Sequence, residues 1–321
     1  MKVKKIGSIF ILVIAALIWG VAFVAQSVGL EYVGPFTLNA TRFALGGIVL
    51  IPVIFAMDRI SGKSPSLWGS KDRNDRRTLL KGGVLCGLAL SIATALQQIG
   101  LGYTSVGKAG FITAFYIIVV PLLGLLTGKR VSVLVWASVI IAMVGMYFLC
   151  VNEDFTVNIA DLLILLCALV FSIHILIVDH FAPKVDGVRL SCIQFFVCAA
   201  VNAIPMFLTE TPDIKVILSA WKPIAYTGVL SSGVAYTLQI VGQKNTHPVV
   251  ASLIFSLEAV FAALAGWLIL RQNLSARELL GSLLVFAAII LSQLKKPEGG
   301  KQRKQSEAEI IQASTEDVLN S

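Results

Sequence analysis

The chain has 321 residues, of which 57% are hydrophobic and 14% are charged. Soluble domains usually hold about 45–50% apolar and about 25% charged residues, so this composition excludes an ordinary soluble domain. The formal net charge of +8 would fit nucleic acid binding. However, the basic residues lie between apolar runs, so we expect a lipid bilayer and no nucleic acid as a partner.

Ten apolar runs follow in chain order, and each is close to the length that spans a bilayer as a helix. Residues 295–321 are polar, first basic and then acidic, and this predicts a disordered tail. The basic start of the chain is not followed by a small-residue cleavage site, so the first run is interpreted as a retained span. The runs cover residues 7–28, 35–57, 79–101, 106–127, 132–151, 159–178, 190–208, 222–242, 249–270 and 275–294.

The distribution of lysine and arginine predicts the orientation of these spans. With the N-terminus inside, the inner segments carry 20 of these residues and the outer segments carry 5. Inner loops are the ones that collect basic residues. We therefore expect a multi-pass protein of the inner or plasma membrane, with the N-terminus, the C-terminus and the tail in the cytoplasm.

The two halves of the chain resemble each other weakly. At an offset of 152 residues, Ala16, Leu17 and Phe43 meet the same residue types, and Trp19 meets Phe171. At an offset of 142, Ala109, Ile112, Leu122 and Gly124 also meet identical residues. Each half holds five spans, so the halves would enter the membrane from opposite sides. The prediction is an all-α membrane protein of ten helices in two inverted five-helix repeats, 7–151 and 159–294.

Three segments carry a resemblance to a known family. They are "ALIWGVAFVAQ" at 16–26, "FTLNATRF" at 36–43 and "ASLIFSLEAVFAALAGWLIL" at 251–270. Together they resemble EamA-type permeases of the drug/metabolite transporter superfamily. The chain departs from that pattern at Ala259 and at Arg271–Gln272, where the family commonly has Pro and Gly-Glu. The resemblance implies a permease that exports small metabolites or amino acids.

Glu258 is an ionisable residue in the middle of the run 249–270. Polar groups at membrane depth face the bundle interior or a wet cavity. Glu258 could therefore bind a proton or a cationic substrate group, or it could be a neutral hydrogen-bonding residue between helices. Tyr116 lies at the matching place of the other half and could donate its phenol to the cavity, or belong to the core.

Arg42 lies about a third of the way into the second span. It could extend to the outer headgroups. It could instead pair with an acid or hold a substrate carboxylate. Asn39 precedes it by three residues and shares its helix face.

The remaining polar candidates are neutral at physiological pH. The amides could line the cavity or form hydrogen bonds between helices. His174 has no second His or Cys nearby, so it fits a core residue better than a metal ligand, and neither a metal nor a cofactor is expected. The candidates are Gln97, Gln98, Tyr236, Gln239, Trp19, Gln26 and His174.

We expect a secondary active transporter, which exports amino acids or amphipathic amines by alternating access, with or without proton coupling. A facilitator or exchanger without proton coupling is one alternative. An intramembrane enzyme is another, but the chain has no HExxH, paired-aspartate or G-x-S-x-G motif. The sequence leaves open whether the protein is a monomer or a homodimer.

Overall fold

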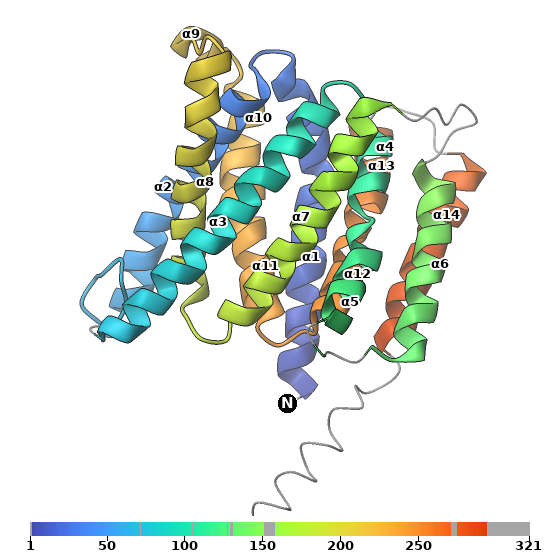
Figure 1. Ribbon diagram of the computed structural model, residues 1–321, viewed down its shortest axis with the longest axis horizontal. Coiled ribbons are helices and arrows are strands. Elements are labelled where there is room, and N and C mark those ends of the chain that lie inside the picture. The colour runs from blue at the N-terminus through green and yellow to red at the C-terminus, as the bar shows by residue number, and fades with distance from the viewer. Residues whose placement is uncertain are drawn as a thin grey trace, which may run out of the picture.

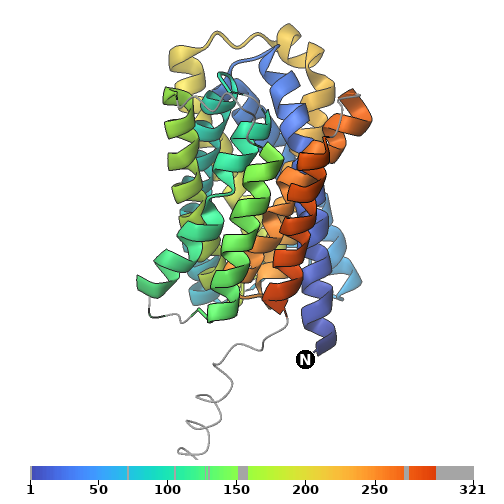
Figure 2. The same ribbon diagram turned by 90° about the vertical axis from the view of Figure 1, so that its right-hand side faces the viewer.

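The computed structural model describes residues 2–70, 72–104, 106–126, 128, 131–150, 158–270 and 275–293. Every regular element in these ranges is a helix. Figures 1 and 2 show a bundle in which the helices run roughly along one common direction. The expected disordered tail, 295–321, lies outside the described residues.

The first half of the chain supplies α1 to α6 to the bundle. Pro35 begins α2 directly after Gly34, where its missing N–H has no helical partner to lose. Asp72 precedes α3 and accepts a hydrogen bond from the Asn74 N–H. The helices are α1 (Lys2–Leu30), α2 (Pro35–Ile60), α3 (Arg73–Leu101), α4 (Val106–Thr113), α5 (Tyr116–Leu126) and α6 (Val133–Cys150).

The second half supplies the remaining elements. Asn158 and Asp161 form a capping box at the start of α7, and Asp186 caps α8. The elements are α7 (Ile159–Phe181), α8 (Gly187–Thr209), α9 (Ile214–Ser219), α10 (Trp221–Ala225), the π-helix η1 (Tyr226–Tyr236), α11 (Thr237–Gln243), α12 (Pro248–Phe255), α13 (Leu257–Leu270) and α14 (Ala276–Gln293).

Helices occupy all ten positions where a span is expected, but three of these spans are not regular α-helices. The fourth is interrupted at Ala114–Phe115 and the ninth at Ser256. The eighth widens into η1, which includes Gly228, Ser231 and Gly233. Hydropathy alone would suggest a regular, continuous helix at each of these places. The structure differs there, because apolar composition does not report where the backbone departs from a regular α-helix.

Eight helical segments within the described residues are long and apolar enough to cross a membrane. The shorter apolar helix Val133–Phe148 adds a ninth candidate, and α14 lies at the tenth expected position. The chain is therefore a multi-pass membrane protein, while the count of ten spans stays a prediction. The eight segments are Ile6–Leu30, Pro35–Ile60, Arg73–Leu101, Lys108–Leu126, Ile159–Phe181, Gly187–Thr209, Trp221–Gln243 and Pro248–Ala265.

The helices pair in a reciprocal way between the two halves. α2 packs against α8, and α6 packs against α14 along one edge of the bundle (Figure 1). α3 packs against α7, and α1 packs against η1 and α11. α4 and α5 contact α7, while α12 and α13 contact α1. Exchanging the two halves would reproduce each of these pairings.

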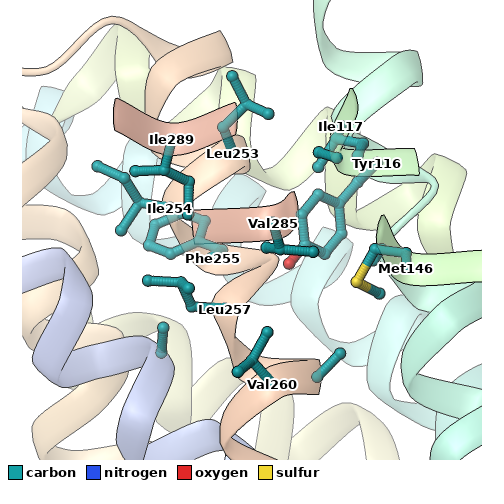
Figure 3. Packing of buried hydrophobic residues seen from close by; sticks show 14 of the residues in the cluster. Tyr116, Ile117, Met146, Leu253, Ile254, Phe255, Leu257, Val260, Val285 and Ile289 are labelled. Carbon is teal, nitrogen blue, oxygen red and sulfur yellow. The ribbon is translucent and has the colours of Figure 1, made fainter. Parts of the chain in front are cut away.

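The apolar core lies where the two interrupted spans meet α6 and α14. Figure 3 shows Ile117, Met146, Ile254, Val285 and Ile289 around this contact. Other large apolar side chains stay exposed on the outside of the bundle, where lipid would cover them. Examples are Ile48, Ile92, Leu166, Ile204 and Leu283.

Candidate functional site

A cavity lies between the two halves of the chain. It contains about 500 Å³ of unoccupied space, counting the part that opens to solvent. Its walls come from α1 to α5 in the first half and from α7, η1, α11, α12 and α13 in the second. The lining residues are Trp19, Phe23, Gln26, Arg42, Gln97, Thr113, Tyr116, Phe171, Ile175, Ser231, Tyr236, Gln239, Phe255 and Glu258.

Most of the lining residues form pairs at the two offsets found in the sequence. At an offset of 152, Trp19 matches Phe171 and Phe23 matches Ile175. At an offset of 142, Gln97 matches Gln239, Thr113 matches Phe255, and Tyr116 matches Glu258. Four residues have no partner in the lining, namely Gln26, Arg42, Ser231 and Tyr236. The cavity is therefore built from corresponding positions of the two halves, and Arg42 departs from that symmetry.

Glu258 meets Tyr116 across the cavity. The Tyr116 hydroxyl donates a hydrogen bond of 2.9 Å to Glu258 Oε1. Tyr116 begins α5 and Glu258 lies in the first turn of α13, so each follows the interruption of its span. Figure 3 shows the Tyr116 oxygen directed toward the segment that carries Phe255 and Leu257. The N-terminal end of a helix favours negative charge, so α13 supports an ionised Glu258, while burial opposes it.

Aromatic rings form one wall of the cavity. Trp19 packs against Tyr236 with ring centroids 4.7 Å apart, and against Phe255 at 5.4 Å. The Trp19 indole N–H donates to the Ser231 carbonyl in η1 at 3.3 Å. A π-helix uses i→i+5 hydrogen bonds and occurs mainly at functional sites. These contacts make one wall of the cavity aromatic.

Arg42 is held inside the bundle by amide side chains. Its Nε donates to Asn39 Oδ1 at 3.1 Å and its Nη1 to Gln26 Oε1 at 2.5 Å. Gln98 also donates to Gln26 Oε1. The side chain is 2% exposed, so Arg42 does not extend to the headgroups and that alternative is wrong. Arg42 also stacks its guanidinium over the Phe43 ring at 4.7 Å.

A further amide, Asn202, holds Asn39, which is one of the two hydrogen-bond acceptors of Arg42. Asn39 Nδ2 donates to Asn202 Oδ1 at 3.2 Å. Asn202 Nδ2 in turn donates to Ser91 Oγ at 2.8 Å and to the Cys198 carbonyl at 2.9 Å. Sequence reasoning did not select Asn202, because an isolated amide within a span has no recognisable pattern. The network joins α1, α2, α3 and α8 around one guanidinium.

Eight of the eleven residues proposed from the sequence line the cavity. Gln98 and Asn39 lie behind Arg42 instead, in its hydrogen-bond network. His174 bonds to Gln194 Oε1 through Nε2 at 3.2 Å and contacts the edge of the Tyr236 ring. The eight are Glu258, Arg42, Tyr116, Gln97, Tyr236, Gln239, Trp19 and Gln26.

Gln97, rather than Gln98, shares the lining with Gln239. The sequence matched Gln98 with Gln239 at an offset of 141, one residue away from the offset that relates Tyr116 to Glu258. The structure favours the common offset of 142, because Gln97 then also has a partner in the cavity. The Gln97 amide donates to the Thr113 hydroxyl at 3.4 Å, and the Gln239 amide donates to Gln243 Oε1 at 2.9 Å.

Comparison with known proteins agrees with this architecture. An uncharacterized transporter of Archaeoglobus fulgidus is 29% identical over 294 residues, covering 91% of this chain and 88% of that protein. An uncharacterized transporter of Clostridium kluyveri is 23% identical, covering 84% and 87%. The protein PecM of Dickeya dadantii is 34% identical over 97 residues, which is 30% of this chain and 33% of PecM.

A solved crystal structure superposes with a TM-score of 0.73 at 19% identity, covering 90% of this chain and 96% of that one, and it supports the fold alone. The sequence profile of the EamA-like transporter family matches twice, at residues 6–151 and 158–294. The two matches together span nearly the whole length of the helical bundle. The chain therefore belongs to the EamA-like transporter family of the drug/metabolite transporter superfamily.

Proposed function

We propose that this membrane transporter exports small amphipathic amines or amino acids in exchange for protons. The observation that carries the proposal is the placement of Glu258 in the cavity between the halves, where Tyr116 is its hydrogen-bond partner. A carboxylate at this depth is costly unless it faces protein, water or a ligand. In the cavity Glu258 faces protein, and the open space has room for water or a ligand.

The two halves form inverted repeats that rock against each other to expose the cavity to one side at a time. Two features support this arrangement, namely the reciprocal helix pairings and the matched pairs of lining residues. The interruptions at Ala114–Phe115 and Ser256 also lie at corresponding places. Broken helices in matching positions of two halves typically mark the substrate site of secondary transporters.

Protons and the substrate amine compete for Glu258 in this mechanism. When the cavity faces the cytoplasm, the ionised carboxylate binds the amine. When the cavity faces outward, a proton neutralises the carboxylate, so the attraction for the amine is lost and the substrate leaves. Each cycle therefore exchanges one amine for one proton at the same group.

The protein lies in an inner or plasma membrane. Its N- and C-termini are on the cytoplasmic side. The excess of basic residues in the inner segments supports this orientation. Figures 1 and 2 support it as well, since the start of α1 and the end of α14 lie at the same end of the bundle. A reporter that is active only in the cytoplasm, fused after Ser321, should be active.

Glu258→Gln tests the coupling directly, because it keeps the size and the hydrogen bonding of the side chain but cannot ionise. Purified wild-type and variant protein in liposomes should be compared for export of radiolabelled leucine and of an amphipathic amine, with and without a pH gradient. We expect the gradient to accelerate wild-type transport and to have no effect on the variant.

Glu31→Gln is the matched control, since Glu31 is exposed in the turn directly after α1. It should behave as wild type. A Glu258→Gln variant that keeps the full response to the gradient would show that the carboxylate only bridges helices. If the pH gradient does not change the rate of transport by the wild type, a facilitator without proton coupling is favoured instead.

A further inference from the structure

The cavity contains a buried cation that lacks a counterion. Arg42 is 2% exposed, and both of its hydrogen-bond acceptors are the neutral amides Asn39 and Gln26. No ion pair in the described ranges of the chain includes Arg42. A buried charge is normally paired, because leaving it without a partner has a large desolvation cost.

The guanidinium also has an unused nitrogen. Arg42 Nη2 is buried and makes no hydrogen bond within the described structure. A guanidinium presents its N–H groups as a planar fork that matches the two oxygens of a carboxylate. Nε and one N–H of Nη1 are occupied, so both N–H groups of Nη2 and one N–H of Nη1 are left without an acceptor.

The surrounding network fixes that edge in place. Gln26 accepts from both Arg42 and Gln98, and Asn39 is itself held by Asn202. These contacts come from four helices, and none of them neutralises the charge. Such an arrangement orients a cation and leaves it without a counterion, which is what a site for an anionic group requires.

From these contacts we infer that the substrate carries a carboxylate and that Arg42 binds it. The inference deepens the proposed transport function and rests on it, because it narrows the substrate from amines in general to zwitterionic amino acids. The substrate carboxylate binds the Nη1–Nη2 edge, its amine binds Glu258, and its apolar side chain packs on the aromatic wall of Trp19 and Tyr236. Nη2 is buried in this conformation. The carboxylate therefore needs the cavity to widen, which the alternating-access cycle of the proposed function provides.

Three probes separate the two charges of the ligand. Leucine has both, leucinamide has only the amine, and N-acetylleucine has only the carboxylate. Binding of each to purified protein is measured by calorimetry and by the rise in thermal unfolding temperature. We expect wild type to bind leucine about ten- to a hundredfold more tightly than leucinamide, the range for hydrogen bonds to a charged group.

Arg42→Gln should remove this preference and leave the affinity for leucinamide unchanged. Arg73→Gln is the matched control, because Arg73 is an exposed arginine at the start of α3, and it should retain the preference. Arg42→Lys keeps the charge without the fork, so it should lie between wild type and the glutamine variant.

Gln26→Glu is a second variant that does not remove the arginine. It keeps the oxygen that accepts from Arg42 and Gln98, and loses only the hydrogen bond from Nε2 to the Ala22 carbonyl. The new carboxylate neutralises Arg42 internally, so leucine should bind about tenfold more weakly while leucinamide does not.

Equal affinity of wild type for leucine and leucinamide would overturn the carboxylate site. So would a Gln26→Glu variant that is folded and binds leucine as wild type does. If none of the three probes binds, the inference also fails, whereas proton-driven export of an amphipathic amine would leave the proposed transport function standing.

Discussion

Charged residues at the ends of the helices differ from those inside the cavity. At the helix ends, Arg189 Nη2 lies 2.6 Å from Asp58 Oδ1, and Lys108 Nζ lies 2.6 Å from Asp161 Oδ2. These acids and bases neutralise each other. In the cavity, Arg42 and Glu258 receive only neutral partners, although both residues are buried.

The comparison shows that buried charges at the helix ends are paired with opposite charges, whereas the two buried ionisable side chains of the cavity have neutral partners. Arg189 and Asp58 also share the backbone of Ser66, which donates to the carboxylate and accepts from the guanidinium, both at 3.0 Å. This cluster ties Ser66, in the loop after α2, to the last turn of α2 and the first turn of α8. We infer that its role is structural, whereas in the proposed function the isolated charges of the cavity bind a ligand or a proton.

The largest effect on stability should come from breaking the pair at the helix ends. Arg189→Ala leaves Asp58 without its partner, so we expect the free energy of unfolding to fall. Thermal unfolding in detergent measures it. Arg77→Ala, at an exposed arginine in α3, is the control and should have little effect.

Removing both charges of that pair should restore most of the stability. The double variant Asp58→Asn/Arg189→Gln keeps hydrogen bonding and leaves no buried charge unpaired. By contrast, Arg42→Gln and Glu258→Gln should each be at least as stable as wild type. If they unfold as readily as Arg189→Ala, the charges of the cavity are structural and the comparison fails.

A smaller loss of stability is expected from adding a methyl group where α1 closely approaches the N-terminal part of α13. A Cβ added at Gly20 would lie 2.5 Å from Phe261 Cβ and 2.7 Å from the Glu258 carbonyl oxygen. Gly20→Ala must therefore displace backbone, which costs about 1–3 kcal/mol. It should also reduce transport, because the backbone of Glu258 is among the groups that the new methyl contacts.

Gly7→Ala is the matched control for Gly20→Ala. No heavy atom lies within 4 Å of a Cβ added at Gly7, which is in the same helix. Alanine favours a helix by up to about 1 kcal/mol over glycine, so this variant should be neutral or slightly stabilised. Equal transport rates for both variants would show that the close approach of α1 to the Glu258 backbone does not affect transport.

The smallest effect on stability should come from Tyr116→Phe. It removes one hydrogen bond to Glu258, and such bonds between membrane helices average about 0.6 kcal/mol. Its functional effect is clearer, because the ionised carboxylate loses a hydrogen bond that favours it. The pH profile of transport in liposomes should therefore shift toward higher pH, and an unchanged profile would separate Tyr116 from the proton step.

Much of this architecture follows from sequence pattern. Each of the ten apolar runs coincides with helix, since apolar length is what a bilayer selects. The offset of 142 residues places Tyr116 and Glu258 at matching positions of the two halves, and the structure adds that their side chains form a hydrogen bond. The same offset also relates Gln97 to Gln239, although the sequence alone favoured Gln98.

The environment of Arg42 could not be predicted in the same way. Hydropathy reports that Arg42 is in a span, but not that α1, α3 and α8 surround it. Asn202 lies 163 residues away from Asn39, and a contact at that separation leaves no trace in local pattern. The interruption at Ser256 and the widening of η1 likewise depend on how neighbouring helices pack.

The central claim is that Arg42 and Glu258 recognise separate charges of one ligand. The most direct test measures the affinity for leucine, leucinamide and N-acetylleucine in wild type, Arg42→Gln and Glu258→Gln. The account predicts a crossed result, in which Arg42→Gln weakens only the two carboxylates and Glu258→Gln weakens only the two amines. A result in which either variant weakens all three ligands equally, or none of them, would contradict it.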